Sequence, residues 1–585
     1  MTPKNFSLHG RLEPTIVVNG LEYLDLGWND FNGTIPRELG NLTNLQVLSL
    51  EGLRKCGTET LDWLSRLSQL EDLGLSNLDL SLNKLDGIPK YLGNLCSLTT
   101  LNFYFNSMPV HFPDFLSNLS GCTSFTLQNL VASGSQLIGS FSNDIERFSS
   151  MKYLSLSNNQ LNGTISEKVW HLPRLQRLDF SYNSLKGAIS EYIGKTKISV
   201  IDLSNNPLEG VPFKAHMSNI SNVKEIDLSS CKLGPRFPKW IHMLKNLSRI
   251  DIANTGISDT IPEDFWNMWP SQLTYMNLSS NNITGKLIDL LSNFGSEPPT
   301  LDLSSNNFYG PIPNVSSALQ WLDLSKNKFN GKINFVCQIV DGFLFFLDLS
   351  QNSFTGQIPD CLWHFKELKL LSLGNNNLFG RLPASIKYLF NLEIMYLYNN
   401  SLSGELPLSL KKCTSLTFLE LGSNNFSGHI PVWIGENLPG LYTLSLTSNN
   451  FFGTIPSQLC YLVNLQILDL SINNLYGTIP SCLNNLTSMV QNGFSPHQNV
   501  HYFNFTSGTE YVDHAMIKWQ GVMREFGLEV PHSSGESEGD GEDTDELKKW
   551  FYIGGAAGFA IGFWIVCIVL LVTRRGKRIF YYMNL

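Results

Sequence analysis

The chain has 585 residues, of which 41 are Lys or Arg and 50 are Asp or Glu, so its formal net charge at pH 7 is -9. An apolar content of 42% is enough for a large core and excludes a wholly disordered chain. The mildly acidic balance argues against nucleic acid as a partner, because phosphate binding needs clustered Lys and Arg. Ten Cys are too few for a disulfide-based scaffold of this length.

From Leu21 onward the chain repeats one frame, LxxLxLxxNxLxGxIP. Fifteen of the eighteen intervals between starts are 23 to 26 residues long, a period typical of leucine-rich repeats. Near residue 70 two frames overlap, from Leu70 and from Leu75; we take the second and interpret the overlap as a deletion of one or more coils. The nineteen starts are residues 21, 45, 75, 98, 122, 151, 175, 198, 223, 247, 273, 298, 319, 344, 368, 392, 416, 441 and 465.

The leucine spacing predicts the fold. In the LxL part of a coil, Leu301 and Leu303 point inward from a short strand, whereas Asp302 points outward to the concave face. One coil is too thin to bury its own leucines, so stacked coils bury one another's. We therefore expect an α/β solenoid, a curved leucine-rich repeat horseshoe of about 19 coils, with a concave sheet roughly 90 Å long at about 4.8 Å per strand.

An Asn stands at the ninth position of most coils, where the chain turns away from the strand. A buried amide there can satisfy backbone groups of the turn, which would otherwise be costly to leave unpaired. Cys231 occupies the same position, which predicts a structural rather than a reactive thiol. The asparagines are Asn159, Asn183, Asn206, Asn281, Asn306, Asn327, Asn352, Asn376, Asn400, Asn424, Asn449 and Asn473.

The second half of the repeat, LxGxIP, occurs at Gly310–Pro313 and Gly453–Pro456 among other places. Because Pro cannot donate to a ladder, this part must run at a sheet edge or as extended chain on the flank. This version of the coil resembles the plant-type extracellular repeat of receptor-like kinases, receptor-like proteins and polygalacturonase inhibitors. The resemblance spans about Leu21 to Met489.

Residues 550–572 form an uncharged apolar run of 23 residues. At 1.5 Å per residue a helix of this length reaches about 34 Å, so the run predicts a single transmembrane helix. Basic residues from Arg574 to Arg578 follow it and acidic residues from Glu529 to Glu546 precede it, which predicts a type I orientation in the plasma membrane with the repeats outside.

Within this helix, Gly554, Gly558 and Gly562 lie on one face and would let a second helix approach closely. The alternative is that small residues are simply common in membrane helices. The short basic tail, residues 573–585, cannot hold a kinase, and the chain has no HRD or DFG motif. Any signal must therefore leave through a partner.

Fourteen Asn-x-Ser/Thr sequons agree with passage through the secretory pathway, although an Asn-rich repeat also produces sequons by chance. In an oxidising compartment, the coil offsets of Cys337 and Cys361, and of Cys460 and Cys482, could bring each pair to disulfide distance. The predicted glycosylation sites are Asn5, Asn32, Asn41, Asn118, Asn162, Asn219, Asn246, Asn277, Asn282, Asn314, Asn399, Asn425, Asn485 and Asn504.

The two ends of the repeat region are irregular. Residues 1–20 have no apolar run or cleavage site of a signal peptide, and the first coil has no Cys-bearing cap, so we expect part of the protein upstream to be missing. The domains expected are residues 1–20 as an N-terminal remnant, 21–490 as the repeat ectodomain, 491–528 as an island without repeats, 529–549 as an acidic juxtamembrane stretch, 550–572 as the transmembrane helix and 573–585 as the cytoplasmic tail.

This order of parts resembles plant receptor-like proteins of the Cf and ethylene-inducing xylanase receptor type. The resemblance implies a kinase-free cell-surface receptor that binds an extracellular ligand, microbial or peptide, and signals in defence through an adaptor receptor-like kinase and a co-receptor kinase. In that family further coils follow the island; here the acidic stretch follows directly, which puts docking of a co-receptor in doubt. The alternatives are a developmental co-receptor without a kinase and a binding protein of the polygalacturonase-inhibitor kind.

Binding in such a receptor would use outward strand positions, where aromatic side chains make rigid anchors. The same aromatics are also consistent with scattered surface residues. The outward Asp of the DLS triplets recurs in many coils, which favours the repeat's own hydrogen bonding over catalysis or a cation site. No metal-ligand spacing occurs among the eleven His, so we expect no enzyme, cofactor or metal. The ligand-binding candidates are Trp28, Tyr104, Phe105, Tyr182, Tyr396 and Tyr398.

Overall fold

The computed structural model describes residues 20–53, 56–57, 61–75, 90–106, 109–194, 196–210, 222–267, 273–288, 299–315, 317–339, 344–486, 500–502, 510–512, 514–519 and 522–527. The chain divides into two units. The first contains the repeats up to Gln498 together with Ala515–Phe526, and the second contains Asn499–His514 and the residues from Gly527 onward.

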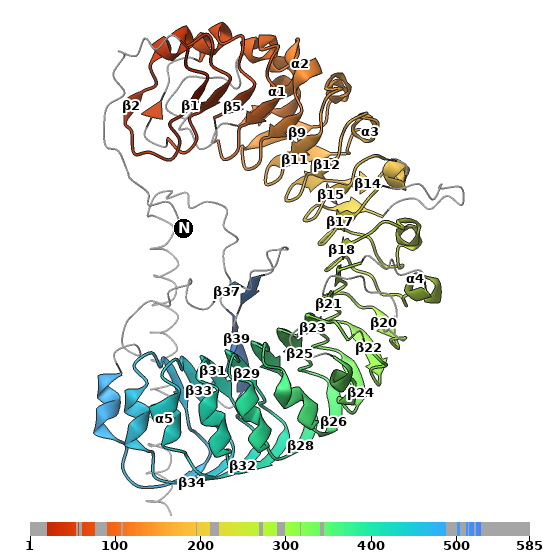
Figure 1. The fold of residues 1–585 in the computed structure, drawn as a ribbon. Coiled ribbons are helices and arrows are strands. Elements are labelled where there is room, and N and C mark those ends of the chain that lie inside the picture. The colour runs from red at the N-terminus through yellow and green to blue at the C-terminus, as the bar shows by residue number, and fades with distance from the viewer. Residues whose placement is uncertain are drawn as a thin grey trace, which may run out of the picture. The chain divides into compact units, whose positions relative to one another are not determined.

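Each coil of the first unit contributes one three-residue strand to a parallel sheet of 19 strands, as Figure 1 shows along the inner side of the stacked coils. Neighbouring strands pair LxL against LxL, for example Leu301 opposite Leu322. The predicted solenoid and its coil number are thus confirmed. The strands are β1 (Tyr23–Asp25), β3 (Val47–Ser49), β5 (Asp72–Gly74), β6 (Thr100–Asn102), β8 (Asn129–Val131), β10 (Tyr153–Ser155), β12 (Arg177–Asp179), β15 (Val200–Asp202), β17 (Glu225–Asp227), β18 (Arg249–Asp251), β19 (Tyr275–Asn277), β21 (Thr300–Asp302), β23 (Trp321–Asp323), β25 (Phe346–Asp348), β27 (Leu370–Ser372), β29 (Ile394–Tyr396), β31 (Phe418–Glu420), β33 (Thr443–Ser445) and β35 (Ile467–Asp469).

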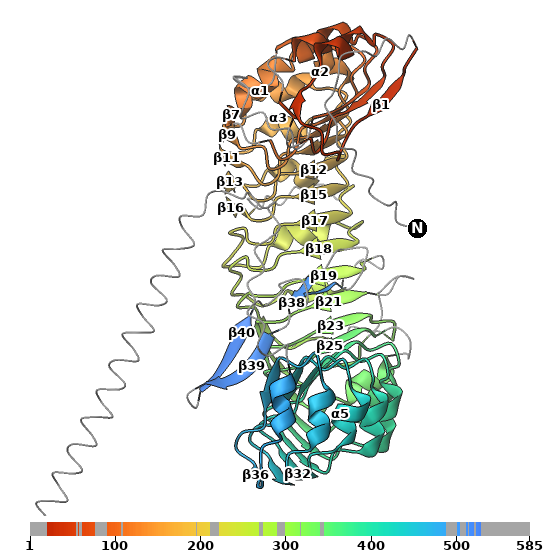
Figure 2. The same ribbon diagram turned by 90° about the vertical axis from the view of Figure 1, so that its left-hand side faces the viewer.

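The LxGxIP parts add strands of two to five residues on the flank. There the even-numbered strands from β20 to β36 form a sheet of nine strands, and β7, β9, β11 and β13 form a sheet of four. Figure 2 shows the coils from β12 to β25 as successive rungs, with β7, β9, β11, β13 and β16 along one side. The flank strands are β2 (Gly33–Thr34), β4 (Cys56–Gly57), β7 (Val110–His111), β9 (Leu137–Ser140), β11 (Gln160–Gly163), β13 (Ser184–Leu185), β14 (Gly187–Ala188), β16 (Leu208–Glu209), β20 (Thr284–Gly285), β22 (Asn307–Gly310), β24 (Lys328–Gly331), β26 (Ser353–Gln357), β28 (Asn377–Gly380), β30 (Ser401–Gly404), β32 (Asn425–His429), β34 (Asn450–Gly453) and β36 (Asn474–Leu475).

Short helices, mostly of the 3₁₀ type, return the chain on the side opposite the long sheet. The α-helices are α1 (Phe112–Asn118), α2 (Thr123–Thr126), α3 (Glu167–Trp170), α4 (Glu263–Asn267) and α5 (Trp433–Asn437). The 3₁₀ helices are η1 (Arg37–Asn41), η2 (Asp62–Arg66), η3 (Lys90–Asn94), η4 (Asn143–Arg147), η5 (Glu191–Gly194), η6 (Lys239–Met243), η7 (Asn334–Gln338), η8 (Asp360–His364), η9 (Ala384–Tyr388), η10 (Leu408–Lys412), η11 (Ser457–Tyr461) and η12 (Ser481–Asn485).

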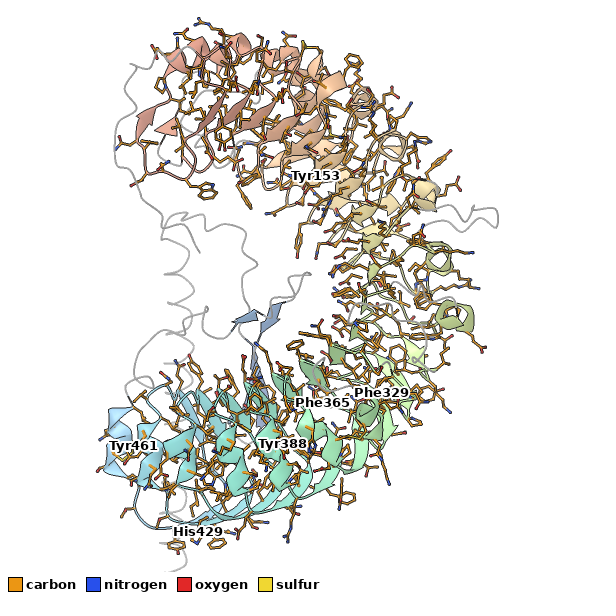
Figure 3. All side chains as sticks on the ribbon, in the orientation of Figure 1. Tyr153, Phe329, Phe365, Tyr388, His429 and Tyr461 are labelled. Carbon is orange, nitrogen blue, oxygen red and sulfur yellow. A yellow bond between two sulfur atoms is a disulfide. The ribbon has the colours of Figure 1, made fainter. Side chains whose placement is uncertain are left out.

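The core runs through all coils as columns of leucines and aromatic rings. Leu301 and Leu303 are fully buried, as expected from the frame. Phe329, labelled in Figure 3, lies in such a column, with its ring centroid 6.0 Å from that of Phe308 and 6.3 Å from that of Phe354. Because each buried ring contacts the equivalent ring in the next coil, the core is a set of repeated neighbour contacts rather than one central cluster.

The ninth-position asparagines form a ladder that joins consecutive coils. The Nδ2 group of Asn306 donates to the carbonyl oxygens of Leu278 in the preceding coil (2.9 Å) and of Leu303 and Ser304 in its own coil (3.2 and 3.0 Å). Its Oδ1 accepts a bond from Ile283 N (3.0 Å). All twelve predicted asparagines make the bond to the preceding coil, at 2.8 to 3.0 Å.

Other residue types take this position in some coils, among them Leu53, Ser135, Cys231 and Thr255. Cys231 Sγ lies 3.3 Å from the carbonyl oxygen of Leu203 in the preceding coil, so it replaces one amide donor, and burial raises the pKa of its thiol to about 12. Thr255 donates from Oγ1 to Ile252 O within its own coil (2.9 Å). The structural role predicted for Cys231 is confirmed, whereas the sequence pattern did not identify Thr255.

Two predicted coil starts were wrong. Strand β5 follows the frame that begins at Leu70, so the start at Leu75 is replaced by the earlier one. Strand β8 belongs to a coil that begins at Leu127, not at Cys122, because the preceding coil is lengthened by α1 and α2. Residues 123–126 resemble part of the repeat frame but form α2.

Three disulfides join neighbouring coils on the helical side. The structure bonds Cys337 to Cys361 and Cys460 to Cys482, the two pairs suggested by the coil offsets. It also bonds Cys96 to Cys122, which the sequence reading did not identify because Cys122 had been placed at a strand start. Each bond closes a loop of one coil, with sequence separations of 26, 24 and 22 residues.

The second unit contains the antiparallel pair β37 (Val500–Tyr502) and β38 (Glu510–Val512). Strand β39 (His514–Trp519) pairs with β40 (Val522–Gly527), and Ala515–Phe526 of this pair belong to the first unit. The predicted transmembrane helix, with Gly554, Gly558 and Gly562, lies outside the described residues. In the part of the chain that is described, no helix is both long and apolar enough to cross a membrane.

The ladder predicts that Asn306→Ala lowers the free energy of unfolding by about 3 kcal/mol, because it leaves buried backbone groups without partners. The change should appear as a lower midpoint of thermal unfolding and as faster amide exchange in the two coils that Asn306 joins. Asn330→Ala is the matched control, since Asn330 is an exposed residue of β24. Equal effects of the two substitutions would contradict a ladder that stabilises the fold.

Candidate ligand-binding face

The long sheet presents two outward side-chain positions per strand, one on each side of the buried central residue. Because the strands are parallel and in register, equivalent positions form columns that run from coil to coil. Tyr153, the first residue of β10, lies on this inner side in Figure 3, whereas His429, the last residue of β32, lies on the outer side. The inner face is therefore a continuous surface on which neighbouring coils place side chains next to one another.

An unbroken run of four aspartates occupies the third position of successive strands. Asp179, Asp202, Asp227 and Asp251 are direct partners across β12, β15, β17 and β18. In each, Oδ1 accepts a bond from the backbone N–H two residues later, at 2.9 to 3.2 Å. This bond is the structural role expected for the repeated aspartate.

The crowded carboxylates have raised pKa values. Desolvation and then the neighbouring charge of Asp227 raise the pKa of Asp202 to about 7 and that of Asp251 to about 7. Asp227 is shifted in the same direction, mainly by desolvation. Desolvation also raises the pKa of Asp302, to about 6. The inner face therefore takes up protons as the pH falls below neutrality.

Asn277 takes the next position after Asp251 and interrupts the run. Its Oδ1 accepts the bond from Ser279 N (3.0 Å) that an aspartate would accept, while its Nδ2 donates to Asp251 Oδ2 (2.9 Å). Tyr275 OH donates to the same Oδ2 (3.1 Å). Asn277 thus performs the backbone role of the aspartate without adding a fifth adjacent charge.

Basic and aromatic side chains stand beside the acidic run. The Arg177 guanidinium lies 5.7 Å from the centroid of the Tyr153 ring, and that of Arg249 lies 3.5 Å from the centroid of Tyr275. Such cation–π pairs hold the two arginines on the inner face. Strands β10 to β19 therefore form a mixed surface of carboxylates, guanidinium groups and phenol rings, which we call the charged surface.

Three of the predicted aromatic candidates are exposed and share an unusual backbone. Trp28, Phe105 and Tyr182 are 64%, 42% and 43% exposed, with φ of 56°, 55° and 52°. Most coils have Asn or Ser at this left-handed position, where bulky side chains are uncommon. Tyr104 lies beside Phe105, half-buried, and its OH donates to Glu51 Oε2 (3.0 Å).

Tyr182 belongs to the charged surface. Desolvation and the charges of Asp202 and Asp227 raise the pKa of its phenol, so the ring lies close to the middle of the acidic run. Of the six candidates, Tyr182 alone combines an exposed ring with these carboxylates. A ligand group that reached Asp202 or Asp227 would contact the Tyr182 ring at the same time.

Tyr396 and Tyr398 differ from the expectation of exposed anchors. They occupy outward positions, but only 5% and 6% of their surfaces are exposed. They belong to a stretch of the inner face in which the first strand position is apolar and buried in five successive strands. This apolar column consists of Trp321, Phe346, Leu370, Ile394 and Phe418, and its first two rings stack at 3.6 Å between centroids. The repeat frame predicts the direction in which a side chain points, but not whether neighbouring residues bury it.

Most described sequons expose their Asn. The exposed ones are Asn32, Asn41, Asn162, Asn246, Asn282, Asn314, Asn399 and Asn425. Asn118 and Asn277 are half-buried, and Nδ2 of Asn277 already donates to Asp251. Asn5, Asn219 and Asn504 lie outside the described residues, and the side chain of Asn485 is not described. Glycosylation of these residues remains a prediction.

The acidic run predicts that the solenoid is more stable at mildly acidic pH than at pH 8. The raised pKa values mean that the folded chain binds more protons than the unfolded chain between about pH 4 and pH 7, so the free energy of unfolding falls as the pH rises through this window. Thermal unfolding from pH 4.5 to 8 should show a decrease in midpoint on the order of a few degrees.

Asp227→Asn should reduce this pH dependence, because Oδ1 of the amide can still accept the bond from Ser229 N while one central charge is removed. Asp469→Asn is the matched control, since its described neighbour in the column is Ser445 rather than an acid. A wild-type midpoint that rises between pH 5 and 8, or a slope unchanged by Asp227→Asn, would contradict the coupling.

The chain matches the Leucine Rich Repeat family over residues 20–42, 150–172, 246–268, 272–294, 343–365, 391–413, 415–437, 440–462 and 464–486. A curated relative, receptor-like protein EIX2 of Solanum lycopersicum, is 37% identical over 345 residues, which cover 54% of this chain and 34% of the relative. The chain thus spans about a third of the length of this relative.

Solved ectodomains show the same fold. The Arabidopsis receptor kinase HAESA, in a complex with the peptide hormone IDA and the co-receptor SERK1, is 30% identical with a TM-score of 0.65, and the match covers 82% of this chain and 79% of that one. The structure of PEPR1–AtPEP1 is also 30% identical, with a TM-score of 0.63 and coverage of 83% and 70%. The chain is therefore a leucine-rich repeat protein whose relatives include plant receptor-like proteins.

Proposed function

We propose that this protein is a cell-surface receptor without a kinase that binds an extracellular ligand, a microbial product or a peptide, and signals in defence through associated receptor kinases. The observation that carries the proposal is the charged surface. Side chains of consecutive coils form one accessible face there, and packing of the core does not require their charged and aromatic groups. The Arabidopsis receptor kinase HAESA, which shares the fold, is solved in complex with the peptide hormone IDA and the co-receptor SERK1. We place the ligand of this protein on the charged surface.

Three further observations support a position outside the cell. The three disulfides between coils are stable in an oxidising compartment. Exposed sequon asparagines occur along the solenoid. The apolar run at residues 550–572, followed by basic residues, fits a single-pass type I protein of the plasma membrane.

The choice of Tyr182 as an anchor follows from its backbone. A left-handed φ of 52° is less favourable for Tyr than for Asn, so the backbone conformation gives no reason for an aromatic ring there. The ring stands over carboxylates that keep part of their hydrogen-bonding capacity, since Asp202 and Asp227 each use Oδ1 for the backbone. A ligand with a basic or amide group beside an apolar surface fits this arrangement.

Tyr182→Asn should therefore separate binding from folding. We expect the unfolding midpoint to stay equal or rise slightly, because Asn tolerates the left-handed backbone, while the response to the ligand falls at least tenfold. The measurement uses plants that lack the gene, challenged with a panel of elicitors and complemented with wild type or variant. Ser305→Asn, at the equivalent position of another coil, is the control.

The outcomes distinguish the roles. Loss of one elicitor response in the knockout, restored by wild type and not by Tyr182→Asn, supports the proposal. A growth defect with intact elicitor responses would instead favour a developmental co-receptor. A full response with Tyr182→Asn would remove Tyr182 from the binding face.

Coupling to an adaptor kinase should depend on the glycine stripe of residues 554–562. Gly558→Leu is expected to reduce co-purification with the kinase several-fold, because a bulky side chain prevents close approach of two helix backbones. Ala560→Leu adds the same bulk two residues away on a different face of the helix and should have little effect. Equal recovery of both variants would place the kinase contact elsewhere.

A further inference from the structure

Part of the nine-strand flank sheet concentrates positive charge. Its first five strands, β20, β22, β24, β26 and β28, follow one another in Figure 1. Four basic residues stand at outward positions of this part, and all four are exposed. They are Lys286, Lys328, Lys332 and Arg381. The five segments contain no Asp or Glu, and we call them together the basic flank. The segments are residues 282–286, 307–311, 328–332, 353–357 and 377–381.

The basic flank contrasts with the rest of the chain, whose net charge is -9. In the same coils, the long sheet presents Asp302, Asp323 and Asp348 side by side. In the part of the chain that the structure describes, none of the four basic residues of the flank forms an ion pair with a carboxylate. These coils therefore separate their charges, with carboxylates on the inner face and uncompensated cations on the flank.

Tyr309 stands between two of the lysines. Lys328 of β24 is its direct partner on one side. On the other side Gly285 pairs with Phe308, so Lys286, the residue after Gly285, lies beside Tyr309. The Tyr309 side chain is 45% exposed. A ligand can therefore contact an aromatic ring and two positive charges at this place.

The stems of the basic side chains pack on the neighbouring coil. A Cβ atom at Gly310 would lie 3.3 Å from Cγ of Lys286, and one at Gly356 would lie 3.3 Å from Cγ of Lys332. The glycine of each following coil thus leaves room for a stem to lie across it. Because these contacts restrict the stems, binding costs less side-chain entropy than it would for freely moving lysines.

Uncharged polar groups occupy the positions between the cations. Thr355 is the partner of Asn377, and Gln357 is the partner of Phe379, whose side chain is 47% exposed. Thr355, Gln357 and Asn377 are exposed too. A ligand that lies across the five strands would meet an aromatic ring near each end, cations along its length, and amide and hydroxyl groups that can both donate and accept hydrogen bonds.

We propose that the basic flank binds an acidic polysaccharide, a chain of sugars that carry carboxylate groups. The cations attract the carboxylates, the two rings pack against apolar faces of the sugars, and the amides and hydroxyls bind sugar hydroxyls. A nucleic acid fits less well because the chain as a whole is acidic. A membrane surface fits less well because polar residues separate the two rings, so no apolar face is available for insertion. This site is separate from the charged surface and shares with the proposed receptor only the position outside the cell.

Binding of the full-length protein in detergent to immobilised polygalacturonate tests the proposal. We expect binding that weakens as the NaCl concentration rises and that is lost when the carboxylates are methyl-esterified. Lys328→Gln combined with Lys332→Gln should lower the affinity about tenfold, because two of the four cations are removed. Lys411→Gln combined with Lys412→Gln is the matched control, since it removes the same charge from η10 and should leave the affinity unchanged.

Tyr309→Ser separates the ring from the charges. It should lower the affinity several-fold without changing the salt dependence, and the unfolding midpoint should stay the same because the side chain is exposed. Single-stranded DNA and vesicles of acidic lipid, added at equal charge, should not displace the protein from polygalacturonate.

Three results would overturn the proposal: no binding by the wild type, equal loss in the two lysine pairs, or displacement by DNA or by vesicles. Because the measurement needs no elicitor response, its failure is distinguishable from a failure of the proposed receptor function.

Discussion

In most coils a single side-chain amide joins the coil to the one before it. Asn306 and its equivalents satisfy three carbonyl groups and at least one N–H group that the turn after the strand would otherwise leave unpaired. An amide can do so because it combines two donor hydrogens with a good acceptor. Cys231 and Thr255 show that a side chain with one donor can replace the amide, because each supplies a donor to a carbonyl.

The hydrogen bonds of the turn also shape the inner face of the long sheet. The aspartates of the third strand position are used for a bond to their own turn, which explains why they recur, but in-register strands also place them side by side. A residue that recurs for a structural reason thereby also creates an acidic run whose carboxyl groups have raised pKa values. Asn277 shows that an uncharged amide can accept the same backbone bond. The negative charges of Asp202 and Asp227 are therefore not required by this bond, and their role concerns the chemistry of the inner face.

Much of this fold could be predicted from the sequence, because the leucine period and the ladder asparagines each impose a local contact that repeats. The errors arose where the period was interrupted. The helices α1 and α2 lengthen one coil, so Cys122 was read as a strand start and its disulfide with Cys96 was missed. The face was less predictable: the frame gave the direction of Tyr396 and Tyr182 alike, but only the structure shows one buried and the other exposed.

The residues that fix the fold and those that vary on the inner face therefore stand at different positions of the same coil. Leu301 and Asn306 cannot change without loss of contacts to both neighbouring coils, whereas the residue at the left-handed position varies from Ser305 to Tyr182 while φ stays within a few degrees. The backbone at this position is fixed by the ladder bonds on either side of it. An unfavourable side chain is then tolerated locally, because its cost is confined to one coil of a stack whose stability is a sum over neighbours. This separation allows a leucine-rich repeat protein to change the side chains of its inner face without changing its fold.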